Sequence, residues 1–202
     1  PLDVALGARA FLRRGLPRYG LLAGGLLPRG RMDTARIAAR IDAIYAGRPW
    51  PDDPTWVCAV RVRDGRLRVF GREPSAASIG EAVAASSAVP GLLAPIAVDG
   101  DDHVDGAVHS PTNADLVAGL GFDRVLVVAP MAGTADWRDP VRTYHARLLR
   151  REVAAVERSG SEVLVVEPDA ETLTAMGGDA MAPGRERAVA ESARRQGRAL
   201  PL

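Results

Sequence analysis

The chain lacks lysine altogether and has one cysteine and few aromatic residues among its 202 residues. All 26 basic residues are arginine, a bias typical of a high-GC bacterial genome. Cys58 alone cannot form an internal disulfide or a cysteine-based zinc site, and its apolar surroundings predict a buried, inert thiol. Aromatic residues, at 4%, are too sparse to stack nucleic-acid bases, so no nucleic-acid partner is expected. No apolar run approaches the roughly 20 residues of a membrane span.

What is present is the composition of a globular protein, with 47% apolar and 25% charged residues. The charge is uneven, because residues 1–48 hold nine arginines and three aspartates, whereas the rest is acidic on balance. A basic, leucine-rich N-terminal third is suited to anionic lipid or polyphosphate, but it also fits a solvated basic face. His103, His109 and His145 lack the spacing of metal ligands, so neither a metal nor another cofactor is expected, and surface or hydrogen-bonded histidines are favoured.

The periodicity of apolar residues predicts an α/β fold, with residues 1–202 as one domain. Helices are expected at about 4–16, 33–45, 78–88, 113–120, 140–158 and 183–198, and strands at about 56–63, 66–70, 94–98, 103–108, 124–129 and 162–167. Ile37, Ile41 and Ile44 share one face of the second helix. Asp64-Gly65 predicts a hairpin turn, and the last two strands, joined by a long helix, predict a parallel βαβ unit.

Asp105 is the residue that the pattern singles out for chemistry. It is expected to end a short strand and is followed by Gly106, which permits a sharp turn. Carboxylates at the ends of strands commonly carry function in α/β proteins. An ordinary Asp-Gly turn, like that at Asp64-Gly65, accounts for the same residues, so both interpretations stay open.

The sequence around Asp105 resembles the patatin-like phospholipases, in particular the bacterial members. Ala-Ser-Ser-Ala-Val-Pro, which ends at Pro90, is similar to the family's Ala-Ser-x-Ala-x-Pro segment. Val-Asp-Gly-Ala at 104–107 is similar to its Asp-Gly-Gly/Ala motif, with Ala107 in place of the commoner second glycine. Ser-Pro-Thr-Asn-Ala-Asp at 110–115 resembles the continuation of that pattern. The resemblance is closest over residues 56–131.

The resemblance implies a three-layer sandwich with a mostly parallel central sheet and helices on both faces. It also implies a Ser–Asp dyad that hydrolyses acyl esters, in which Asp105 takes the proton of the serine directly. Gly106 and Ala107 would present the carboxylate, and Ser86, Pro90 and Asn113 would support the site. The substrate would be a phospholipid or another acyl ester, and the protein would be cytoplasmic or peripheral to a membrane.

The family's glycine-rich oxyanion loop and its Gly-x-Ser-x-Gly motif do not occur in residues 1–202. The chain is therefore expected to be the C-terminal portion of the domain, with the nucleophilic serine upstream of Pro1 or on an upstream fragment of the same protein. Two alternatives stay open. One is a non-catalytic lipid-binding or interaction protein on a truncated patatin scaffold, and the other is a nucleotide-binding α/β domain, which only the βαβ unit suggests.

Repeated glycine and proline between Gly20 and Arg31 predict a loop, and residues 1–31 suggest a mobile cap over an acyl pocket. In this hypothesis the leucines line the pocket and the arginines face lipid head groups. The residues concerned are Leu16, Leu21, Leu22, Leu26 and Leu27, and Arg13, Arg14, Arg18 and Arg29.

Overall fold

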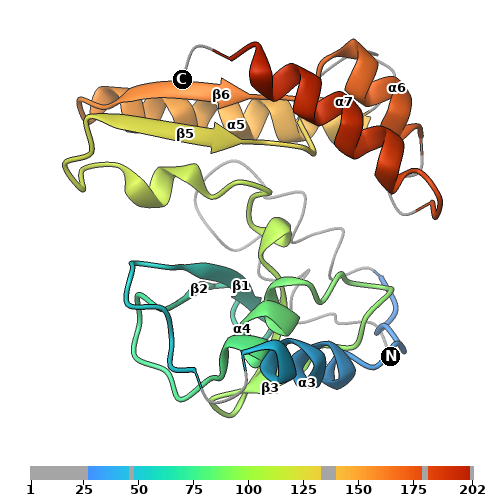
Figure 1. The fold of residues 1–202 in the computed structure, drawn as a ribbon. Coiled ribbons are helices and arrows are strands. Elements are labelled where there is room, and N and C mark those ends of the chain that lie inside the picture. Colours follow the sequence, from blue (N-terminus) through green and yellow to red (C-terminus); the bar gives the residue numbers. More distant parts are fainter. Residues whose placement is uncertain (1–26, 46–47, 133–139, 179–181, 201–202) are drawn as a thin grey trace. The chain divides into compact units, whose positions relative to one another are not determined.

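The chain divides into two compact units, residues 1–110 and residues 111–202 (Figure 1). The computed structural model describes residues 27–45, 48–132, 140–178 and 182–200. The helix predicted at 4–16 and most of the predicted cap, residues 1–26, lie outside the described residues. Helices and sheets are present in both units, in agreement with the predicted α/β class, while the prediction of one domain across residues 1–202 stays a prediction.

The first unit is built on a four-stranded sheet with strand order β2-β1-β4-β3, in which every pair is antiparallel. Its elements are α3 (Ala35–Ile44), β1 (Val57–Arg61), β2 (Leu67–Phe70), α4 (Ile79–Ser86), β3 (Ile96–Val98), β4 (Asp101–Asp105) and the 3-10 helix η1 (Gly106–Val108). The prediction of a mostly parallel sheet is therefore wrong for this unit. The hairpins that join β1 to β2 and β3 to β4 are too short for the crossover that a parallel pair requires.

Two turns explain the antiparallel pairing of β1 with β2 and of β3 with β4. Asp99 and Gly100 join β3 to β4, and both have positive φ angles, of 51° and 81°, as a two-residue type I′ turn requires. The predicted Asp64-Gly65 hairpin is confirmed, with Gly65 at a φ of 64°. The loop of this hairpin spans residues 62–65, because the last hydrogen bond between the two strands joins the Arg61 amide to the Arg66 carbonyl oxygen (2.9 Å).

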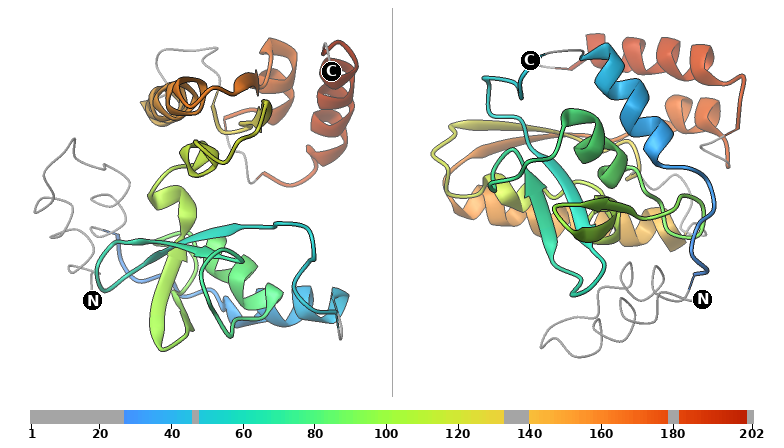
Figure 2. Two further views of the ribbon diagram at one scale, coloured as in Figure 1. Left: turned by 90° about the vertical axis from the view of Figure 1, so that its left-hand side faces the viewer. Right: turned by 90° about the horizontal axis from the view of Figure 1, so that it is seen from below.

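The two faces of this sheet bury different residues. Helix α4 packs on one face, where Ala59 and Phe70 of the sheet meet Ala82 and Ala85 of the helix (Figure 2). Val60, Val62 and Val104 alternate with the residues of the first face, and they form a second cluster with Val108 of η1. Strand β1 thus contributes a buried side chain to each face, which is expected of a central strand rather than an edge strand.

Helix α4 begins at Ser78 with a capping box. The Ser78 hydroxyl accepts a hydrogen bond from the Glu81 amide (3.0 Å), while the Glu81 carboxylate accepts one from the Ser78 amide (2.8 Å). The Ser78 hydroxyl also donates to Asp42 of α3 (2.8 Å). Asp42 accepts a second bond from the Gly80 amide, so one carboxylate holds the two helices together.

Helix α3 confirms the prediction over 33–45 but turns a different face toward α4. Ala38 is the buried residue of the helix, and Ile44, on the face that it shares with Ile37 and Ile41, is 71% exposed. A close approach of the two helices explains this. A Cβ on Gly80 would lie 2.2 Å from the Ala38 carbonyl oxygen, so small residues are needed where the backbones meet.

The second unit contains the predicted βαβ element. Its elements are the 3-10 helix η2 (Ala114–Val117), β5 (Arg124–Val128), α5 (Pro140–Arg158), β6 (Glu162–Val166), α6 (Ala170–Met176) and α7 (Glu186–Arg198). Strands β5 and β6 pair in parallel, from Arg124 opposite Glu162 to Val128 opposite Val166, as predicted. The helix predicted at 113–120 is wrong in length and type, because Asn113 and Gly119 take left-handed φ angles on either side of η2.

Helix α5 covers one face of the β5–β6 pair. Val127 and Ala129 of the β5 segment pack with Leu149 and Val153 of α5 in one apolar cluster. Leu126 and Val128, which point to the opposite face, are 52% and 63% exposed. None of the helices in the described ranges is both long and apolar enough to cross a bilayer.

The junction of α3 and α4 generates the first prediction, for Ser78→Ala. This substitution removes the N-cap of α4 and the bond to Asp42, so we expect the free energy of unfolding to fall by about 1–2 kcal/mol. Urea unfolding followed by circular dichroism measures the change. Ser87→Ala at the other end of α4 is the matched control, and equal losses in the two variants would contradict the role of the capping box.

Candidate active site

Asp105 is the last residue of β4, as the sequence predicts. It lies opposite Ala59 of β1, and its amide donates to the Ala88 carbonyl oxygen (3.0 Å) in the loop after α4. Asp105 is half-buried. The predicted strand at 103–108 is shorter than expected at this end, because the backbone leaves the sheet at Gly106 and enters η1.

Gly106 is required here by a close approach rather than by an unusual φ. A Cβ at this position would lie 2.3 Å from the carbonyl oxygen of Cys58 in β1, well inside van der Waals contact. The backbone can therefore turn directly against the neighbouring strand. The turn brings the Ala107 amide to the Asp105 carboxylate, which accepts its hydrogen bond at 2.8 Å. Gly106 and Ala107 thus form the turn that adjoins the carboxylate, and their role in presenting it for chemistry stays a prediction.

Burial raises the pKa of the Asp105 carboxyl, and the hydrogen bond from the Ala107 amide opposes this shift only in part. No basic side chain of the described residues forms an ion pair with it. A carboxylate in this state binds a proton more readily than an ordinary aspartate. It can therefore serve as a general base, since the efficiency of a base improves as its pKa approaches the working pH.

The other acidic residues around this sheet are neutralised by arginine. Asp64 accepts from Arg61 (2.5 and 3.0 Å), and this lowers the pKa of Asp64 to about 2. The Ser75 hydroxyl, which donates to Asp99 (2.7 Å), lowers the pKa of Asp99, and the ion pair with Arg68 (3.0 Å) lowers it further. These ion pairs are half-buried, whereas Asp105 is half-buried without an ion pair to any described residue.

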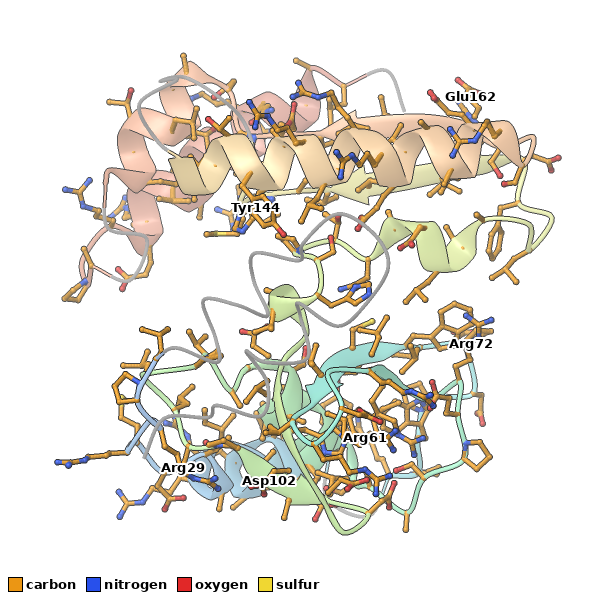
Figure 3. All side chains as sticks on the ribbon, turned by 180° about the vertical axis from the view of Figure 1, so that it is seen from behind. Arg29, Arg61, Arg72, Asp102, Tyr144 and Glu162 are labelled. Atoms are coloured by element: carbon orange, nitrogen blue, oxygen red, sulfur yellow. The ribbon has the colours of Figure 1, made fainter. Side chains whose placement is uncertain are left out.

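Arg29 and Asp102 form another of these ion pairs, at 3.0 Å (Figure 3). The cap hypothesis places Arg29 against lipid head groups, but the structure joins it to the sheet. The backbone after it is also tied down, because Met32 exchanges hydrogen bonds with Leu92 and Ala94.

Two of the three predicted supporting residues lie in the segment beside Asp105. Ser86 ends α4 and Pro90 follows it in the loop, on either side of the Ala88 carbonyl that binds the Asp105 amide. Both are half-buried. Asn113 is buried and has a φ of 48°, but it belongs to the second unit, so its support of the site stays a prediction.

Sequence reasoning assigned Leu27 to an acyl pocket but missed three other exposed apolar side chains in or beside the loop that binds the Asp105 amide. Val89 and Leu92, in the loop that holds its amide, are 43% and 42% exposed. Leu27 and Met32, beside the same loop, are 44% and 56% exposed. The signal was available in Val-Pro-Gly-Leu-Leu at 89–93, an apolar loop with no polar residue. We name Leu27, Met32, Val89 and Leu92 the apolar loop surface.

His103, two residues before Asp105 on β4, is a buried histidine and was correctly predicted to be hydrogen-bonded. Its Nδ1 donates to the Asp101 carbonyl oxygen (2.9 Å), and its ring lies against Phe70. Burial lowers the pKa of His103, so the ring is neutral at neutral pH. Cys58, predicted to be buried, is half-buried in β1. Within the described ranges no three His, Cys, Asp or Glu side chains gather as metal ligands would.

The chain matches a family model described as Patatin-like phospholipase over residues 7–118, which is more than half of its length. The matched range contains the whole four-stranded sheet, α3, α4 and the Asp105 turn. It also reaches further toward the N-terminus than the stretch in which the resemblance is closest. No curated protein was found to match the chain.

The contact between Gly106 and Cys58 predicts that Gly106→Ala is destabilising. The added methyl group meets the Cys58 carbonyl and must displace backbone, so we expect the free energy of unfolding to fall by about 1–3 kcal/mol. Gly197→Ala is the matched control, since a Cβ there meets no atom within 4 Å and α7 gains helix propensity. Urea unfolding that shows no loss for Gly106→Ala would contradict the steric account.

The raised pKa of Asp105 predicts that Asp105→Asn stabilises the protein at neutral pH. A raised folded-state pKa means that the contribution of Asp105 is fully present below about pH 3.8 and is lost as the pH rises through the folded pKa. Asparagine cannot ionise, so the variant avoids this loss and still accepts the Ala107 bond. The gain should vanish at acid pH in unfolding titrations at several pH values.

Asp64→Asn gives the opposite sign and serves as the comparison. Its lowered folded-state pKa, about 2, means that the ionised form contributes stability above about pH 3.8, which the variant loses. A loss of stability in Asp105→Asn at neutral pH would show that its carboxylate is not a desolvated, unpaired group.

Proposed function

The chain belongs to the patatin-like phospholipase family, and from that premise we propose that it forms part of a serine acyl hydrolase acting on phospholipids or smaller lipid esters. The observation that carries the proposal is Asp105, a half-buried carboxylate without a basic partner among the described residues, held at the end of β4 by the Gly106 turn. At the level of the family, hydrolysis of ester bonds is the expected activity.

In the proposed mechanism Asp105 is the general base of a Ser–Asp dyad. A serine oxygen attacks the carbonyl carbon of the ester while its proton passes to an Asp105 carboxylate oxygen. The protonated Asp105 then gives the proton to the departing alcohol as the acyl–oxygen bond breaks. Water hydrolyses the acyl-serine in the second half, again with Asp105 as base. The raised pKa of Asp105 suits both directions of transfer.

The Ala107 amide has a positioning role in this mechanism. Its hydrogen bond fixes one carboxylate oxygen of Asp105 at 2.8 Å and so orients the other for proton transfer. The serine and the oxyanion-binding amides would come from sequence outside residues 1–202, because no Gly-x-Ser-x-Gly occurs within them. The hydrolase would therefore require an upstream part of the same protein.

The apolar loop surface supports a lipid ester as substrate. Its four exposed apolar side chains belong to segments bonded to one another and to the backbone of Asp105. Apolar surface beside a reacting group favours an acyl chain over a polar substituent. Residues 1–31 would cap this region, and the protein would work in lipid degradation.

A three-layer arrangement of the complete domain is proposed as well. The exposed Leu126 and Val128 leave one face of the β5–β6 pair apolar, which is suited to burial under a second layer.

The missing nucleophile motif favours a second candidate function, a non-catalytic lipid-binding or interaction protein on the same scaffold. A Gly-x-Ser-x-Gly upstream of Pro1 would remove the ground for that alternative.

Asp105→Asn tests the proposal in the full-length protein. We expect kcat for a short-chain ester to fall by about 10²–10⁴-fold, because the serine loses its base while the fold keeps the Ala107 hydrogen bond. Asp102→Asn, on the same strand but paired with Arg29 at the surface, is the matched control and should retain activity. Wild-type esterase activity in Asp105→Asn would overturn the dyad.

The intact mass before and after treatment with a serine-reactive fluorophosphonate separates the two candidate functions. One covalent adduct on the protein or on a co-purifying upstream piece indicates a hydrolase with a reactive serine. A mass of 21.3 kDa with no adduct and no second piece favours the non-catalytic alternative.

A further inference from the structure

Helix α5 carries four exposed arginines on the face that points away from its sheet. They recur at spacings of three, four and seven or more residues, so they share one side of the helix. Leu149, Val153 and Val156 occupy the opposite side, packed inward. We name Arg147, Arg150, Arg151 and Arg158 the arginine face. Figure 3 shows α5 from the side away from β5 and β6.

The acidic residues of α5 do not neutralise this face. The helix has two, and Glu152 is buried, where it accepts from the Thr112 hydroxyl (2.5 Å) and the Ala114 amide (2.9 Å). Glu157 lies at the flank of the arginine face but forms no ion pair with any described residue. The four arginines likewise have no ion-pair partner in the described ranges.

Several exposed arginines elsewhere on the protein are paired, by contrast. Arg63 pairs with Asp101 (3.0 Å) and Arg187 with Glu191 (2.9 Å) although both arginines are highly exposed. Arg195 pairs with Glu171. The arginine face is thus a local excess of positive charge that the sequence of α5 maintains by placing one of its two carboxylates in the core.

The geometry of this face suits several phosphate groups at once. From Arg147 to Arg158 the helix rises about 16 Å, and Arg147, Arg150, Arg151, Ala154 and Arg158 border an open hollow of about 380 Å³. Guanidinium groups bind phosphate oxygens in bidentate fashion. The hollow has no aromatic residue on which a base could stack.

We propose that the arginine face of α5 binds the surface of an anionic phospholipid bilayer. The choice of a bilayer rests on the proposed function, because a lipid ester hydrolase must reach substrate held in a membrane. The apolar side of α5 is buried against β5 and β6, so the helix lies on the head groups without inserting. The contact is electrostatic, and salt screens it.

Flotation with large unilamellar vesicles tests this surface. We expect the protein to bind vesicles that contain phosphatidylglycerol, not vesicles of phosphatidylcholine alone, and to be released by molar NaCl. Replacing all four arginines by glutamine should weaken binding by about 100-fold or more, given the contribution of each basic residue near an anionic surface. Circular dichroism and urea unfolding verify that the variant is folded.

The matched control removes the same charge from arginines that already have partners: Arg36→Gln, Arg63→Gln, Arg187→Gln and Arg195→Gln. This control should bind anionic vesicles within a few-fold of wild type, because the arginines that it removes are each paired with a carboxylate in the wild-type protein. Equal losses in both variants would overturn the proposal in favour of a general charge effect. Unchanged binding by the variant of the arginine face would overturn it directly.

Two further experiments distinguish this proposal from the proposed catalytic dyad and from the binding of other anionic ligands. Asp105→Asn should bind vesicles like wild type whether or not it hydrolyses esters, so failure of the dyad and failure of the membrane surface are distinguishable. A single-stranded oligonucleotide, or inorganic phosphate at millimolar concentration, that binds the arginine face while anionic vesicles do not would identify a different ligand and overturn the bilayer assignment.

Discussion

The pairing of β1 with β4 is the constraint on which the candidate site depends. It places Asp105 opposite Ala59 and brings Gly106 against the Cys58 carbonyl, so the chain must leave the sheet at that residue. The turn delivers the Ala107 amide to the carboxylate, and the Ala88 carbonyl holds the Asp105 amide from the other side. The position, burial and proton affinity of the carboxylate all follow from one antiparallel register.

Ion pairs surround the first sheet, whereas the two places where function is proposed carry charges without an ion-pair partner among the described residues. Asp64, Asp99 and Asp102 each have an arginine partner, and so do most of the arginines around the first sheet. Asp105 is half-buried and forms no ion pair with a described residue. The arginine face of α5 is exposed, and Glu152 of the same helix is buried and does not pair with it. A buried charge without a partner costs stability, so Asp105 is a candidate for function. The arginine face is a candidate for a different reason, because its clustered positive charge attracts anions.

Local sequence signals predicted most of the elements well. Ser78 and Glu81 have the spacing of the capping box of α4, and Asp64-Gly65 predicts the first hairpin. The two apolar strands on either side of a long amphipathic helix predict the βαβ unit. The errors arise where neighbouring segments decide. The strand at 103–108 ends early because Gly106 meets β1, and the helix at 113–120 shrinks to η2 because Asn113 takes a left-handed φ. Helix α6 was not predicted at all, since its seven residues carry too short a pattern.

The sequence by itself determined the family, through the Asp105-Gly106 turn and the segment before it, and it identified the residue on which the proposed chemistry rests. Only the tertiary structure decided that this aspartate lacks a basic partner in the described ranges while its neighbours are paired, and that the larger sheet is antiparallel. It alone decided which side of α5 carries unneutralised arginines. The reason is physical: motifs and turns depend on residues adjacent in the chain, whereas desolvation, ion pairing and exposure depend on what packs across from them.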